Sequence, residues 1–163
     1  MRRMLSVTAV LALALGAQAV PRRAEGQAAP RQPQRNIPCK TPEIASMCYW
    51  TRGMITCCNG NPSMRMWKVG TKRILGILSG PNSWRIDPED SLHPELPSNL
   101  GRAYDAEYKR RAAVNDPNVG LPGPVFGDFE VCPLEPERKG EMQAMCIESA
   151  KNIFFDATKR GYR

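Results

Sequence analysis

The stretch that decides the fold is residues 48–78, which read CYWTRGMITC, CNGNP, SMRMWKV, GTKR and ILGIL in succession. The first, third and fifth of these segments are rich in aromatic and β-branched residues or alternate apolar with polar side chains, which is typical of β-strands. Asn59 and Gly60 lie between the first two strands and tolerate the positive φ that a tight hairpin turn requires. Residues 70–73 supply a second turn. We therefore expect a three-stranded antiparallel meander over residues 48–78.

After this meander the sequence predicts a long proline-rich loop, one helix and a hairpin. Residues 79–98 combine several prolines with Asp, Ser and Asn, a composition typical of extended loops. Residues 98–114 have helical spacing, and residues 125–132 and 141–149 have strand character. We expect a mostly β protein, namely a small antiparallel β-sandwich with one short helix and a long Pro-rich loop, stabilised by disulfides.

The first residues fix the expected compartment. Residues 1–19 contain a short basic segment, an apolar run and a small-x-small site ending at Ala19, the order of a secretory signal peptide cut before Val20. The apolar run is too short to span a bilayer. Residues 20–38 are predicted to be a disordered, basic, Pro-rich linker. Residues 39–158 are predicted to form a single β-rich domain, and residues 159–163 a frayed basic tail.

Charge is distributed unevenly between these segments. The formal net charge of +7 falls to +5 without residues 1–19, and residues 20–38 carry +3 of it. The remaining +2 is small for a domain that binds nucleic acid through a basic face. We therefore expect an exported protein, periplasmic or extracellular, without a membrane span and without a nucleic-acid partner.

Six cysteines in an exported chain predict disulfides. A hairpin between the last two strands would bring Cys132 and Cys146 within bonding distance, so we predict a bond between them. Cys39 and Cys48 would then pair with each other or with the neighbouring Cys57 and Cys58. A zinc site is disfavoured, because the chain has no Cys-x-x-Cys pair and one histidine.

Several segments carry a family resemblance. Residues 50–55, 59–62, 64–67 and 127–131 read WTRGMI, NGNP, MRMW and GDFEV. They resemble transthyretin-like and carboxypeptidase-regulatory-like β-sandwich modules, which have a mid-strand glycine, a turn before a proline and a later Gly-x-Phe/Tyr-x-Val strand. Residues 48–78 with 126–146 also resemble a group of short exported bacterial proteins without an assigned activity. The resemblance implies a sandwich fold and brings no catalytic residue.

Candidate chemistry is concentrated in the loop after the meander. His93 is the single imidazole, so a secreted hydrolase would have to use it with an acidic partner, but no nucleophile motif accompanies it. Calcium prefers several oxygen ligands on a flexible turn, as in a calcium-stabilised adhesin-like module. Its candidate ligands are Asp87, Glu89, Asp90 and Glu95. Prolines interrupt their spacing, so we favour a solvated acidic turn and a solvated histidine.

The aromatic residues offer a candidate binding surface. Tyr49, Trp50, Trp67 and Trp84 could form an exposed platform for a glycan or a peptide. Aromatic residues in a regular hairpin usually pack in the core or across strands, which is the interpretation we favour. The sequence as a whole predicts a non-enzymatic binding or structural module without a cofactor, whose partner is a protein, a peptide or a glycan. A secreted hydrolase and a calcium-stabilised module are the alternatives.

Overall fold

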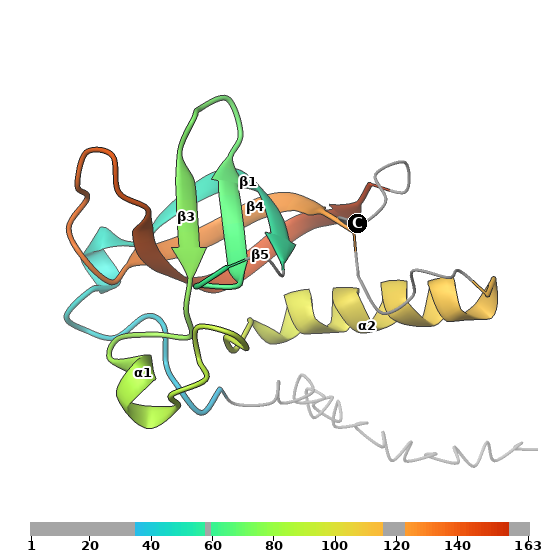
Figure 1. Cartoon of the computed structure of the whole chain (residues 1–163), viewed down its shortest axis with the longest axis horizontal. Coiled ribbons are helices and arrows are strands. Elements are labelled where there is room, and N and C mark those ends of the chain that lie inside the picture. Colours follow the sequence, from blue (N-terminus) through green and yellow to red (C-terminus); the bar gives the residue numbers. More distant parts are fainter. Residues whose placement is uncertain (1–34, 58–59, 116–122, 157–163) are drawn as a thin grey trace, which may run out of the picture. The chain divides into compact units, whose positions relative to one another are not determined.

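The computed structural model describes residues 35–57, 60–115 and 123–156. The expected meander is present as three antiparallel strands, β1 (Tyr49–Cys57), β2 (Met64–Lys68) and β3 (Ile74–Ile77). Gly60 and Gly70 have positive φ angles of 92° and 80°, as the two predicted turns require. The expected hairpin is formed by β4 (Val125–Pro133) and β5 (Gln143–Phe155). The protein is thus mostly β, as predicted (Figure 1).

The predicted sandwich is wrong, because the sheet closes into a five-stranded barrel in the order β1-β2-β3-β5-β4. Closure depends on the pairing of β5 with two strands. Its first residues pair in parallel with β3, with Leu75 opposite Gln143, and its later residues pair antiparallel with β4. Two bulges bend the β4–β5 ladder. Residues 143–149 already pair with both neighbours, so it is the parallel pairing with β3 that closes the barrel, and the extension to Phe155 lengthens the β4–β5 ladder.

The barrel encloses one apolar core. Its fully buried members come from every strand, and they include Ile55, Met66, Leu75, Ile77, Val125, Phe129, Val131, Met145 and Ile147. In β4, Phe129 and Val131 face inward together, as their alternation predicts. Gly53 leaves the space that this core needs, since a Cβ there would lie 2.4 Å from the sulfur of Met66.

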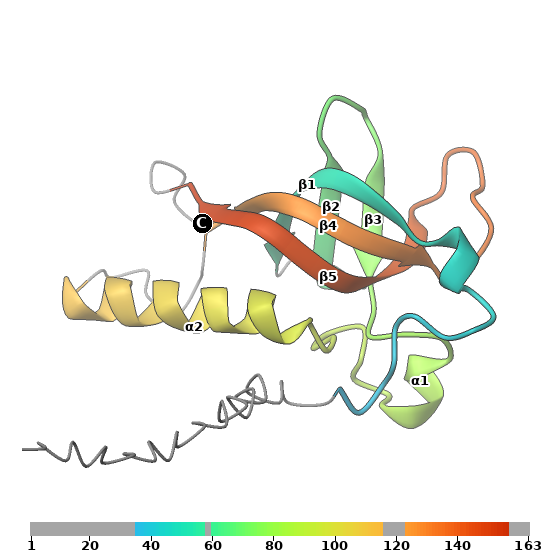
Figure 2. The ribbon, with the colours of Figure 1, turned by 180° about the vertical axis from the view of Figure 1, so that it is seen from behind.

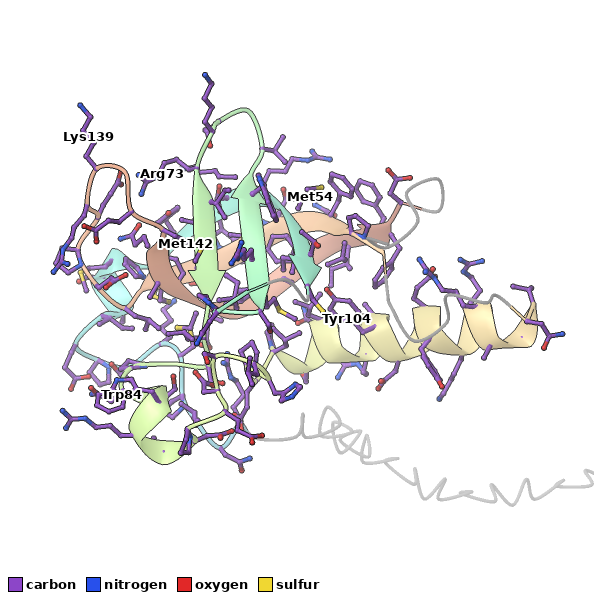
Figure 3. The ribbon with its side chains drawn as sticks, viewed as in Figure 1. Met54, Arg73, Trp84, Tyr104, Lys139 and Met142 are labelled. Carbon is purple, nitrogen blue, oxygen red and sulfur yellow. A yellow bond between two sulfur atoms is a disulfide. The ribbon has the colours of Figure 1, made fainter. Side chains whose placement is uncertain are left out.

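The expected helix is α2 (Ser98–Ala113), and it packs against β5. Leu100 is fully buried, and the Tyr104 ring meets Phe155 edge to face at 5.3 Å, which places Tyr104 between helix and barrel (Figure 3). Ser98 does not cap the helix, since Pro97 occupies the cap position. The predicted loop before it contains one further helical turn, α1 (Ser83–Ile86).

A buried ion pair stabilises the second half of α2. Arg110 donates two hydrogen bonds to the carboxylate of Glu107, at 2.7 and 2.8 Å, and Arg111 Nε donates another at 2.8 Å. Glu107 and Arg111 are 8% and 5% exposed. The hydrogen bonds from Arg110, and then those from Arg111, lower the pKa of Glu107 to about 2, although burial acts in the opposite direction.

Stability should therefore depend on the ionisation of Glu107. A lowered folded-state pKa stabilises the protein above the ordinary value of 4.5, and this stabilisation is lost as the pH falls through about 2. We expect Glu107→Gln to lower the free energy of unfolding by about 2 kcal/mol at pH 7, a value reduced for the solvent exposure of Arg110. Urea titrations at pH 7, 4 and 2 measure this; the difference from the unsubstituted chain should shrink toward pH 2. A difference that is constant over this range would contradict the assignment.

The segment before β1, residues 35–48, is here called the N-terminal strap. It includes the short 3-10 helix η1 (Ala45–Met47). Arg35 is deeply inserted and donates to the carbonyls of Ser79 (2.5 Å), Glu95 (2.7 Å) and Ile147 (2.6 Å). Ile37 is 3% exposed. The folded domain therefore begins before residue 39, within the last residues of the predicted linker.

The predicted Cys132–Cys146 bond is wrong. The two residues lie directly opposite each other in the β4–β5 register, as a hairpin requires. Each bonds to the N-terminal strap instead, in the pairs Cys39–Cys146 and Cys48–Cys132. The reason is that both sulfurs sit on the outer side of the hairpin, where the strap covers them and buries a small second cluster. Cys57 is also disulfide-bonded, and Cys58 lies outside the described residues.

The connectivity defines a class of fold. Five strands form a closed Greek-key barrel, β3 and β5 pair in parallel, and α2 lies in the connection between β3 and β4. This is the connectivity of the OB-fold, whose members present a sheet face and adjoining loops to their ligands. Figure 2, which views the barrel from behind, shows β1, β4 and β5 side by side.

Candidate ligand-binding face

A row of apolar side chains crosses the outer surface of the barrel. Direct register partners connect it from strand to strand, in the order Ile74, Trp67, Met54, Phe126 and Phe154. Side chains of direct partners lie on the same side of a sheet. Their strand neighbours face the core, since Leu75, Met66, Ile55 and Val125 are buried. These five residues, here called the apolar row, therefore lie on the solvent side of all five strands.

The apolar row is continuous and accessible. Phe154 is 48% exposed, and its ring stacks on Phe126 with the centroids 5.2 Å apart. The other members are partly buried. Five strands spaced by about 4.8 Å give the row a length of roughly 19 Å along the curved surface. A contiguous apolar surface of this length is typical of a binding site, whereas scattered single apolar residues are not.

A hollow lies at the β3 end of the row. It has a volume of about 350 Å³ and is lined by Lys72, Arg73, Ile74, Gly140, Glu141 and Met142. Ile74 belongs to both the hollow and the row, so the two are continuous. The walls come from the β2–β3 turn and the β4–β5 loop, where Arg73 and Lys139 are labelled in Figure 3. Arg73 Nη1 pairs with Glu137 at 3.0 Å, and Nη2 is buried and has no hydrogen-bond partner among the described residues.

The β1–β3 half of this surface, here called the meander face, is basic. Arg52, Arg65 and Lys72 are on the solvent side of their strands or of the connecting turn. Within the described residues none of these three side chains takes part in an ion pair, although Arg65 Nε contacts the Pro62 carbonyl at 3.3 Å. The nearest acidic register partner is Asp128, opposite Arg52. The meander face thus combines an apolar strip with three cationic side chains.

The four predicted aromatic residues do not form one platform. Trp67 lies in the apolar row, whereas Trp84 is 60% exposed on α1, with Arg85 4.9 Å above its ring. Trp50 is 46% exposed on β1 under Lys151, at 4.1 Å. Tyr49 is 36% exposed at the end of the barrel, where Lys68 lies 5.1 Å from its ring. Burial first, and then Glu137, raises the pKa of Tyr49. Tyr49, Trp50 and Trp84 therefore lie outside the core, whereas Tyr49 and Trp50 pack against lysines of other strands.

The loop after β3 places His93 on the surface. Its backbone N–H donates to the Glu89 carbonyl at 3.0 Å. In the part of the chain that the structure describes, no hydrogen bond joins the imidazole to a side chain. A carboxylate or hydroxyl that would orient this imidazole for catalysis does not accompany it there.

Three of the four candidate calcium ligands, Asp87, Asp90 and Glu95, accept hydrogen bonds from separate partners. The oxygens of Glu95 accept from Asn36 and from the N–H of Ile37, and Asp87 accepts from the N–H of Glu89. Burial would raise the pKa of Glu95, but the hydrogen bonds from Ile37 and Asn36 lower it overall. Among the described residues, no three of these carboxylates come close enough to share an ion. In the described ranges one group is close enough, namely Cys39, Cys132 and Cys146, and its sulfurs form disulfides.

Asp90 is the deepest of the four and is 1% exposed. It accepts hydrogen bonds from the hydroxyls of Ser79 and Ser83, and the N–H of Ser79 lies 3.2 Å from both of its oxygens. The Ser79 hydroxyl in turn accepts from the N–H of Glu95 at 2.6 Å. These bonds hold the two ends of the loop after β3 together, which is a structural role.

One signal in the sequence would have located the meander face. Residues 44–86 contain no Asp or Glu, but they contain Arg52, Arg65, Lys68, Lys72, Arg73 and Arg85. Summing the charge over the whole domain hides this segregation, because the acidic residues of the domain other than Glu43 follow from position 87 onward. A charge count over shorter windows would have indicated that this segment is basic.

No family model matches this chain, and no curated protein and no solved structure matches it either. The OB-fold connectivity therefore stands on the strand order and pairing alone. In the described part of the chain, no helix is long and apolar enough to cross a membrane. In OB-folds the face of strands β2 and β3, with the β1–β2 and β4–β5 loops, binds oligonucleotides and oligosaccharides. The meander face and the hollow occupy the same place here.

Proposed function

We propose that this protein is an exported, disulfide-stapled binding module without catalytic activity, and that it binds an extended ligand on the meander face. The observation that carries the proposal is the apolar row, which reaches the solvent side of all five strands and ends in a hollow. The two disulfides between strap and hairpin support an oxidising compartment.

The position of the row supports a ligand that lies across the strands. A stable barrel has no structural need for apolar residues on its outer wall, where polar residues usually alternate with the core positions. Trp67 is at the centre of the basic half, between Met54 and Ile74. A central aromatic residue surrounded by aliphatic side chains is the usual composition of a binding hot spot.

We expect Trp67→Ala to lower the affinity for any bound ligand at least tenfold, because hot-spot tryptophans contribute about 2 kcal/mol or more. The assay is a titration on an array of immobilised oligosaccharides and peptides. The matched control is Trp84→Ala, which removes the same side chain from α1, away from the row.

A second substitution separates an effect on binding from an effect on folding. Met54→Gln keeps the side-chain volume but places an amide in the row, so it should weaken binding with little effect on the melting temperature. The proposal is wrong if Trp84→Ala reduces binding as much as Trp67→Ala, or if both Trp67→Ala and Met54→Gln bind normally.

A further inference from the structure

We propose that the four cysteines between the N-terminal strap and the β4–β5 hairpin bind one zinc ion when their disulfides are reduced. These residues, Cys39, Cys48, Cys132 and Cys146, are here called the sulfur cluster. The domain is then stapled at one place by disulfides in an oxidising compartment and by zinc in a reducing one. The inference goes beyond the proposed function and does not depend on the ligand of the meander face.

The sulfurs of the cluster already lie close to the spacing of a metal site. The Sγ atoms of Cys39, Cys132 and Cys146 are within 4.8 Å of one another. In a tetrahedral zinc site each sulfur is about 2.3 Å from the ion, which places the sulfurs about 3.8 Å apart. The sulfur of Cys48 is bonded to that of Cys132 at 2.05 Å and is the nearest fourth ligand. Opening this bond frees the Cys48 side chain to rotate toward the ion.

Two parts of the fold hold these ligands in place without the disulfides. Cys132 and Cys146 are direct register partners in the β4–β5 ladder. The strap carries the other two ligands and has anchors of its own: Arg35 donates to three carbonyls, and the N–H of Lys40 donates to Glu148 at 3.1 Å. Reduction removes the covalent links but leaves the contacts that bring the four thiols together.

The donors and surroundings of the cluster select zinc. Thiolates are soft ligands that suit zinc, whereas calcium and magnesium take oxygen ligands. Cys39 is 1% exposed, Cys132 and Cys146 are fully buried, and Ile44 and Leu134 pack against them. Among the described residues, no carboxylate or imidazole belongs to the group. A closed, buried set of four thiolates is typical of a structural zinc site, which has no open position for a substrate.

The spacing of these cysteines along the chain does not reveal such a site. Structural zinc sites commonly take two ligands that are a few residues apart. The bonded members of the sulfur cluster are instead 107 and 84 residues apart. The barrel and the strap bring them together, so the sequence-based argument against zinc does not apply to the folded chain.

Reduction precedes metal binding, and both steps balance. Each of the two disulfides takes up two electrons and two protons from a dithiol, which is itself oxidised to a disulfide. The four thiols formed lose their protons as Zn²⁺ binds, because thiolates are the ligands. Zinc affinity should therefore rise with pH.

The test uses the full chain reduced by a phosphine, which consumes water, converts each disulfide into two thiols and becomes a phosphine oxide. The probes are Co²⁺ and then Zn²⁺. We expect one equivalent of Co²⁺ to give the intense visible absorption of a tetrahedral site with a thiolate-to-cobalt band, and one equivalent of Zn²⁺ to remove both. With zinc the reduced chain should unfold cooperatively, at a higher urea concentration than in chelator, where we expect no cooperative transition.

Matched serine variants distinguish the sulfur cluster from the other thiols. Cys39→Ser removes one ligand and should weaken zinc binding by about 100-fold or more, since even groups that only orient a ligand contribute roughly 10- to 100-fold. It should also shift the cobalt bands, because an oxygen replaces a sulfur. Cys57→Ser/Cys58→Ser leaves the cluster whole and should change the zinc affinity less than about threefold.

Three results would overturn the inference. They are the absence of a tetrahedral cobalt spectrum, equal losses in Cys39→Ser and Cys57→Ser/Cys58→Ser, and metal binding that does not stabilise the reduced chain against urea. The last result would mean that the thiols bind metal in the unfolded chain. The proposed function is tested separately, because binding to Trp67→Ala is measured with the disulfides formed.

Discussion

Replacing Cys39 and Cys146 together by Ala is expected to lower the free energy of unfolding by about 3 kcal/mol. The two disulfides close nested loops with sequence separations of 107 and 84 residues. With Cys48–Cys132 intact, the outer bond restricts the roughly 23 residues by which the two loops differ, which sets the size of the effect. Urea titration followed by tryptophan fluorescence measures it.

Removing both bonds should have a much larger effect. A lone loop of 84 residues is worth about 4.5 kcal/mol in the same chain-entropy treatment. The two losses together approach the whole stability of an ordinary domain. We therefore expect the chain with Ala at Cys39, Cys48, Cys132 and Cys146 to show no cooperative unfolding transition at 25 °C.

Non-reducing peptide mapping provides the control for this prediction. It should recover peptides that join Cys39 to Cys146 and Cys48 to Cys132. A peptide joining Cys132 to Cys146 would contradict the structure, and so would a Cys39→Ala/Cys146→Ala chain as stable as the original.

The strands could be predicted because their signals are local. In β1, β2 and β4 the alternation of side chains is readable residue by residue, and the β4–β5 hairpin follows from adjacent segments. Barrel closure has no such signal. It requires Leu75 to pair in parallel with Gln143, far along the chain, while the following residues of β5 pair with β4.

The disulfides show the same division between local and distant information. Hairpin geometry correctly places Cys132 opposite Cys146. The partner of each depends on the strap, whose docking is set by Arg35 and Ile37, and these two residues lie in the segment predicted to be a linker. Proximity in the sheet was therefore insufficient, because a third segment competed for the same sulfurs.

The candidate site was predicted only in part, through Trp67, for a related reason. Alternation shows that Met54 lies on the opposite face from Ile55, and Trp67 on the opposite face from Met66. It does not show which of the two faces becomes the core. In a sandwich either face of the meander could be buried, whereas in the barrel the face with Ile55 and Met66 is enclosed. Trp67 consequently lies on the outer surface. The cations beside it do not show in the net charge of the whole domain, because acidic residues elsewhere offset them.

The last prediction concerns Asp90, a buried carboxylate that the sequence suggested as a calcium ligand. Asp90→Ala is expected to lower the free energy of unfolding by about 3 kcal/mol, because it leaves the Ser79 N–H and the Ser79 and Ser83 hydroxyls without their acceptor in a buried site. Asp105→Ala, an exposed change on α2, is the matched control and should cost less than about 1 kcal/mol.

Calcium decides between the two roles of Asp90. Because its oxygens already accept hydrogen bonds from Ser79 and Ser83, the loss in Asp90→Ala should be the same in calcium and in chelator, and calcium should leave the melting temperature of the original chain unchanged. Asp90→Asn keeps one acceptor oxygen, so its free energy of unfolding should lie between those of the Asp90→Ala chain and the original chain. A melting temperature that rises by several degrees with calcium, and no longer does so in Asp90→Asn, would instead make this loop an ion site. The hydrogen bonds that now hold Asp90 would then have to open for the metal.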